Sequence, residues 1–158
     1  MDSVRVLLTV LTFAVASAVL ATPLDTAYDF LYAVERGDGS TFLETLTESL
    51  GLQLTGQLEQ LRQIALSDQS IAERLQPRFG ITQWDLENLS PEELLGRILE
   101  GVNLHPAIDV VEEEMSMSGR DADVTLYWDS GGSLSFTMVW EESCWRISGS
   151  DLFSMLFQ

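Results

Sequence analysis

The chain has 158 residues, which is enough for one domain and too few for two ordinary ones. It carries 25 acidic residues against 8 basic ones, contains no lysine, and has a formal net charge of −17. Such an acidic surface repels the phosphates of nucleic acids and anionic lipid headgroups, so neither is expected as a partner. The lack of lysine also excludes covalent catalysis by a lysine amine.

Residues 1–21 have the pattern of a signal peptide. Arg5 precedes an apolar run, and small residues then suit cleavage by signal peptidase after Ala18 or Ala21. The apolar run is short for a membrane span, and retention as an N-terminal anchor is the alternative. We therefore expect an exported protein, periplasmic or extracellular, with a single domain over 22–158 and no membrane contact after cleavage.

Helical patterns follow directly. Thr22 is a good N-cap and Pro23 a good first helical residue, and apolar residues at spacings of three and four then continue to Val34. Gly37 is expected to end this first helix.

The next patterns are interrupted by glycine and proline. A second helix is predicted over 38–50, after which Gly51 and Gly56 break the periodicity. A third amphipathic stretch follows over 54–67, and Pro77 is expected to close a short further turn.

The clearest local signal is S-P-E-E-L-L-G-R-I-L-E-G, over 90–101. Ser90 as N-cap and Glu93 three residues later form a capping box, with Pro91 at the first helical position. Gly101 supplies the C-terminal stop, which predicts a helix of about three turns.

After residue 107 the apolar period changes from 3.6 to 2, which predicts strands. The strands are expected over 108–118, 122–128, 134–140 and 144–148, with a bulge where the alternation slips near Val110. Helices followed by an antiparallel meander indicate an α+β domain, with N-terminal helices packed on a curved antiparallel sheet.

Three stretches, over 27–38, 88–99 and 122–148, together resemble the NTF2-like (cystatin-like α+β) superfamily, especially its small exported bacterial members. The resemblance implies a curved sheet wrapped around helices, forming a cone with a pocket at its open end. That superfamily includes isomerases, dehydratases, ligand binders and protein-binding dimers, so the resemblance does not choose a function.

Enzymes of this superfamily place an Asp, His or Tyr in the cone. His105 is the only histidine and is a candidate general base, with a boundary residue bonded to backbone as the alternative. Asp29 is a second candidate, although it lies off the apolar stripe of its helix and is then solvated.

Large aromatic and apolar side chains are numerous for a small domain. They either fill the core between sheet and helices or line an apolar pocket for a small hydrophobic ligand. The candidates for such a pocket are Tyr28, Tyr32, Trp84, Trp128, Phe136, Met138, Trp140 and Trp145.

Acidic residues gather over 112–114, with Asp121 and Asp123 beyond the next turn. Successive strand residues point to opposite faces, so the three glutamates cannot converge on one cation. A solvated acidic edge that discourages strand-to-strand aggregation is the better interpretation. No metal site and no cofactor is predicted.

One face of the predicted sheet carries uncharged side chains on an otherwise acidic protein. Contact between two copies meets the least charge repulsion there, which predicts a homodimer through this face. The residues expected on it are Thr125, Tyr127, Ser135, Thr137 and Val139.

Cys144 is the only cysteine, so the chain forms no internal disulfide. Trp145 and Ile147 share the core side of the last strand, so Cys144 and Arg146 are expected on the dimer face. Cys144 is then an inert strand residue or bridges to its symmetry mate, and no adjacent base supports a nucleophilic role.

The sequence thus predicts an exported, non-catalytic binding or interaction module whose partner is a second copy, another protein or a small hydrophobic ligand. An isomerase- or dehydratase-type enzyme, or a carrier for a small hydrophobic ligand, is the alternative.

Overall fold

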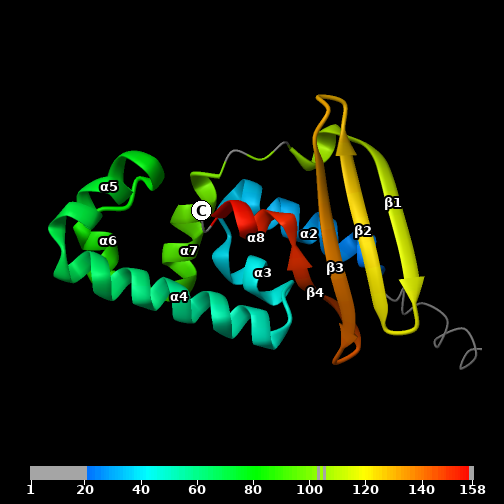
Figure 1. Cartoon of the computed structure of the whole chain (residues 1–158), viewed down its shortest axis with the longest axis horizontal. Coiled ribbons are helices and arrows are strands. Elements are labelled where there is room, and N and C mark those ends of the chain that lie inside the picture. Colours follow the sequence, from blue (N-terminus) through cyan, green and yellow to red (C-terminus); the bar gives the residue numbers. More distant parts are fainter. Residues whose placement is uncertain (1–20, 103, 105, 157–158) are drawn as a thin grey trace, which may run out of the picture.

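Helices occupy the described chain from residue 23 to residue 100, and an antiparallel sheet follows (Figure 1). The computed structural model describes residues 21–102, 104 and 106–156. Its elements in chain order are α2 (Pro23–Arg36), α3 (Gly39–Glu44), α4 (Glu48–Ser67), α5 (Gln69–Phe79), α6 (Gln83–Asn88), α7 (Pro91–Glu100), the 3₁₀ turn η1 (Ala107–Asp109), β1 (Val110–Ser118), β2 (Asp121–Trp128), β3 (Ser133–Glu141), β4 (Cys144–Ser150) and α8 (Asp151–Leu156).

The sheet confirms the predicted α+β class. Its strands follow the order β1-β2-β3-β4, all antiparallel, in a curved sheet that does not close on itself. The register of β1 and β2 shifts between Val110 and Glu112, which confirms the predicted bulge. Helices pack against one face of this sheet (Figure 1).

The first helix begins and ends as predicted. The Thr22 hydroxyl accepts a bond from the Asp25 N–H at 3.2 Å, and the Asp25 carboxylate accepts one from the Thr22 N–H at 2.6 Å. Pro23 occupies the first turn, where its missing N–H costs no hydrogen bond. Gly37 ends α2 in the left-handed region, with φ 62°.

Gly51 and Gly56 do not interrupt the helical pattern as predicted. Both lie inside the 20-residue helix α4, where no other atom lies within 4 Å of a Cβ built on either glycine. The chain breaks earlier, over 45–47, because the backbone there bonds to β4. Thr47 then caps α4 by accepting from the Leu50 N–H at 3.3 Å.

Pro77 does not close its turn either, because α5 continues through it to Phe79. Proline removes one backbone bond, the one its own N–H would give to the carbonyl of Glu73. Glu73 is exposed, so water can satisfy that carbonyl. The helix ends at Gly80, which adopts φ 68°.

The capping box at Ser90 is present as predicted, with the Glu93 N–H donating to the Ser90 hydroxyl at 3.2 Å. Capping boxes that were not predicted begin α2, at Thr22 and Asp25, and α6, at Thr82 and Asp85. Arg62 donates to the Leu89 carbonyl at 2.7 Å and so ties α4 to the segment between α6 and α7.

The core lies between the helices and the inner face of the sheet. Phe30 of α2 is fully buried and contacts the rings of Phe42, Phe136 and Phe153 at centroid distances of 4.6, 5.2 and 6.3 Å. The strands contribute the alternate residues predicted for the core: Ala122, Val124, Leu126, Trp128, Leu134, Phe136, Met138, Trp145 and Ile147.

Helices α4, α5 and α6 extend away from the sheet as an arm (Figure 1). Among the described residues, no helix has the length and apolar character needed to cross a membrane.

Candidate functional site

The aromatic side chains predicted to line a pocket separate into two groups. Trp128, Phe136, Met138 and Trp145 are buried in the core between sheet and helices. Trp140 is partly buried and contacts Trp145 edge-on, with ring centroids 5.4 Å apart. These five residues belong to one core, where their side chains fill space along the inner face of the sheet.

The other three candidates lie toward the surface. Tyr28 is half-buried and donates its hydroxyl hydrogen to the Glu113 carboxylate of β1. Tyr32, one helical turn later, is exposed and lies 6.4 Å from the Tyr28 ring. Trp84 is 62% exposed on α6, apart from the sheet.

Of the two catalytic candidates, the structure describes Asp29 alone. Asp29 is exposed on α2. His105 lies outside the described residues. Among the residues that the structure describes, no group of three or more His, Cys, Asp or Glu side chains is arranged to hold a metal ion.

The outer face of the sheet brings together the residues predicted for it. Thr125, Tyr127 and Val139 are half-buried there, while Thr137 is exposed. The hydroxyls of Thr125 and Ser135 lie 3.1 Å apart across β2 and β3, where either one can donate. At this point of the face the two hydroxyl groups therefore satisfy each other without charge.

A shallow hollow of about 420 Å³ lies over the same strands. Thr125, Ser135 and Thr137 line it, together with Asp123 and Asp151 at its margins. A side chain of a second molecule that enters this hollow would meet hydroxyl groups first.

Acidic residues border the outer face on the side of β1. Tyr127 donates to the Glu114 carboxylate at 2.9 Å, and this bond raises the pKa of Tyr127 above its ordinary value of 10.0. Glu112, directly across from Tyr127, also raises the pKa of Tyr127. Negative charge thus lies beside the uncharged residues of this face, from β1 and from Asp123 of β2.

Cys144 and Arg146 lie at the opposite border, on β4. Cys144 is half-buried with a free thiol, which donates to the Glu141 carbonyl at 3.3 Å. Arg146 lies directly across from Val139 on the same face.

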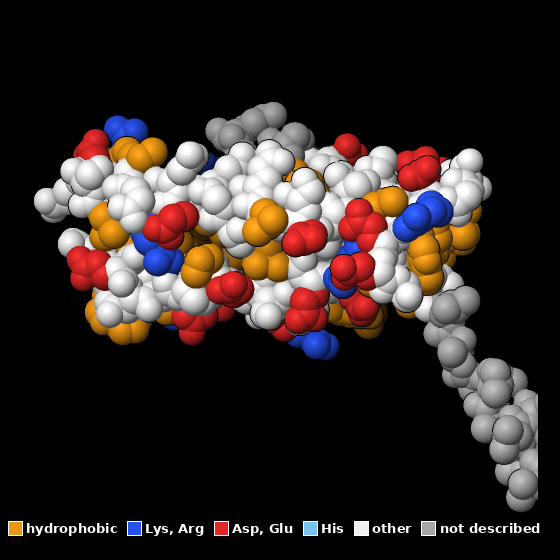
Figure 2. Space-filling view, turned by 90° about the horizontal axis from the view of Figure 1, so that it is seen from below, with side chains coloured by type: hydrophobic (Ala, Val, Ile, Leu, Met, Phe, Trp, Pro, Cys, Tyr) orange, Lys and Arg blue, Asp and Glu red, His pale blue; other side chains and the backbone are white. Residues whose placement is uncertain are grey.

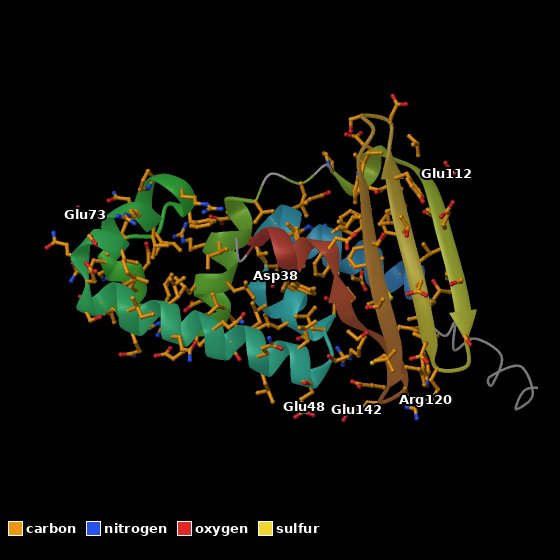
Figure 3. All side chains as sticks on the ribbon, in the orientation of Figure 1. Asp38, Glu48, Glu73, Glu112, Arg120 and Glu142 are labelled. Atoms are coloured by element: carbon orange, nitrogen blue, oxygen red, sulfur yellow. The ribbon has the colours of Figure 1, made fainter. Side chains whose placement is uncertain are left out.

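A larger surface groove of about 680 Å³ was not predicted from the sequence. Arg120 and Arg146 line it between acidic side chains, and Arg120 donates to the Trp140 carbonyl at 2.6 Å. Figure 2 shows charges of both signs intermingled at this end of the molecule, and Figure 3 places Glu48, Glu142 and Arg120 along it. The groove joins the ends of helices and turns that are far apart in sequence, so no local motif marks it. The groove is lined by Ser40, Leu43, Glu44, Leu46, Glu48, Ser49, Glu92, Arg120, Glu141, Glu142 and Arg146.

Comparison with known proteins gives no relative to argue from: no family model, curated protein or solved structure matches the chain.

Proposed function

We propose that this protein is a non-catalytic interaction module, built as an NTF2-like cone, that pairs with a second copy through the outer face of its sheet. The observation that carries the proposal is the contrast between the two faces of one sheet. Large side chains occupy the inner face. The outer face carries a group of uncharged residues of β2 and β3 next to Asp121 and Asp123, in a chain of net charge −17.

The charge distribution supports pairing at this surface in particular. Elsewhere two copies would bring acidic side chains together, and each such pair opposes association. Thr125, Ser135 and Thr137 themselves carry no charge, and Asp123, directly across from Thr137, is the acidic residue nearest to them on this face. A stable pair would need to bury about 800 Å² on each partner.

Sedimentation velocity tests the proposal most directly. We expect a dimer whose dissociation constant falls as salt rises, because at 1 M salt the screening length is only about 3 Å. A monomeric mass at all concentrations in high salt would contradict the proposal.

A matched pair of variants then locates the surface. Thr137→Asp adds a negative charge in the middle of the outer face and is expected to weaken the dimer about tenfold or more. Gln57→Asp adds the same charge on the exposed side of α4 and is expected to leave the dimer unchanged. Equal weakening by both would place the contact elsewhere.

A further inference from the structure

Strand β1 leaves one side of the sheet open. Among the described strands it pairs only with β2, along Val110–Ser118. In an antiparallel pair, alternate residues direct their N–H and C=O groups away from the neighbouring strand. The free side of β1 therefore presents a row of backbone donors and acceptors with no strand beside it.

Two glutamates of β1 lie on the outer face. Glu112 is directly across from Tyr127 and Glu114 from Thr125, and residues directly opposite share a face. Both glutamates are exposed. An added strand would meet negative charge at these two successive positions of the face.

The inner side of β1 is apolar and uncovered. Met115 lies across from the buried Val124, and Met117 from the buried Ala122. Nevertheless Met115 is 44% exposed and Met117 is 56% exposed. Helix α2 reaches β1 through the bond from Tyr28 to Glu113, and the two methionines beyond that bond stay open.

The uncovered apolar surface continues past the bulge. Ile108 and Val111 are both exposed and line a hollow of about 500 Å³ beside Trp128. Asp109 and Asp129 border this hollow, so negative charge again lies beside apolar side chains.

We propose that β1 is a docking edge for an extended basic segment of another protein, which adds to the sheet as a fifth strand. The backbone of the added segment bonds to the free N–H and C=O groups of β1. The apolar residues of the segment cover Met115 and Met117, and its Lys or Arg residues face Glu112 and Glu114. Charge complementarity selects this occupant. A second copy would bring its own 112–114 glutamates to the same edge, and the chain offers no lysine to neutralise them.

This inference is independent of pairing through the outer face. A Thr137→Asp variant that no longer dimerises is expected to bind the basic segment as well as the unchanged protein does. Loss of one activity without the other therefore shows which proposal has failed.

The direct test uses a labelled ten-residue peptide of alternating Lys and Val, about the length of β1. We expect saturable binding by fluorescence anisotropy that weakens as salt rises. A peptide with five Lys followed by five Val has the same composition without alternation, and we expect it to bind about tenfold more weakly. Equal binding of both peptides, or no binding, overturns the proposal.

Two double variants distinguish the effect of the charge on β1 from the effect of the net charge of the protein on peptide binding. Glu112→Lys with Glu114→Lys is expected to weaken peptide binding about tenfold, because two attractions become repulsions. Glu73→Lys with Glu87→Lys changes the net charge equally, on exposed positions of the arm (Figure 3 labels Glu73 and Glu112 at opposite ends). Equal weakening by both pairs would mean that only the overall charge matters.

Amide hydrogen exchange on the unchanged protein identifies the edge without any substitution. We expect the peptide to protect alternate amides along β1, since those are the free donors of the ladder. Binding that protects no β1 amide overturns strand addition. Protection of β1 that rises with protein concentration alone, without peptide, would make a second copy the occupant and likewise overturn the proposal.

Discussion

The two edge strands of the sheet, β4 and β1, differ in what lies beside their free backbone groups. The free side of β4 is met by the chain between α3 and α4: the Thr47 N–H donates to the Ile147 carbonyl at 2.9 Å, and the Ile147 N–H donates to the Thr45 carbonyl at 2.8 Å. Leu46 thereby forms a parallel bridge with Ile147. The free side of β1 has no such cover among the described residues, and Val110 is its only residue that is not exposed.

This difference shows that the sheet is protected in two distinct ways. At β4 the backbone of Ile147 is paired and the side chains of Trp145 and Ile147 are buried, so packing protects this part of the strand. At β1 glutamates lie on both faces of the strand, so charge protects it. Packing excludes every partner, whereas charge excludes only partners of the same sign.

The largest expected effect compares equal truncations at the two borders. Ile147→Ala removes a fully buried side chain and should lower the free energy of unfolding by about 2–5 kcal/mol. Met115→Ala removes a half-exposed side chain and should cost less than about 0.5 kcal/mol. Urea denaturation measures both, and equal losses would show that β1 is packed as tightly as β4.

The sequence predicts the β4 border only in part. Alternation places Trp145 and Ile147 on the core side, because the period of a strand is two and one face is buried. Nothing near Thr47 indicates that the chain breaks there, since the backbone bonds to β4 join segments about a hundred residues apart. The sequence analysis expected Gly51 and Gly56 to break the helix. Each glycine destabilises a helix by only about 1 kcal/mol, and the other contacts of a long helix can offset that loss.

The β1 border is harder to predict for a related reason. The pattern shows which residues share a face, but not whether a helix covers that face. Met115 and Met117 belong to the inner face by register, yet no helix covers them in the described structure. Likewise the groove around Arg120 depends on tertiary packing between helix ends and turns, which leaves no periodic signal in the chain.

The second prediction concerns the hydrogen bond from Tyr28 of α2 to Glu113 of β1. Burial, together with the bond to Glu113, raises the pKa of Tyr28 to about 12 from an ordinary value of 10.0. Because the folded-state pKa is the higher one, this stabilisation is complete below about pH 10 and is lost as the pH rises toward 12. Spectrophotometric titration of the phenols should show one transition near pH 12 that Tyr28→Phe removes.

The same variant measures how much the Tyr28–Glu113 hydrogen bond contributes to stability. Tyr28→Phe keeps the ring and removes only the hydroxyl, so it should cost about 0.5–1.5 kcal/mol near neutral pH. Tyr127→Phe, which removes the bond to Glu114 on the exposed outer face, serves as the control and should leave the transition near pH 12 in place. If the variant at Tyr28 leaves that transition unchanged, Tyr28 is not the group that titrates there.

The last prediction tests whether the negative charge of β1 prevents self-association, and its expected effect on stability is the smallest. Replacing Glu112, Glu113 and Glu114 by Gln keeps the size of each side chain and removes three negative charges from one exposed strand. The amide oxygen introduced by Glu113→Gln can still accept from the Tyr28 hydroxyl, so the free energy of unfolding should change by about 0.5 kcal/mol or less. Self-association should nevertheless increase, because an open strand edge without charge pairs with other copies.

Light scattering against protein concentration measures this self-association. The control is a triple variant with the same change of charge at Glu59, Glu73 and Glu87 on the arm. If both variants associate equally, the net charge of the protein keeps copies apart, and the glutamates of β1 have no special part in it.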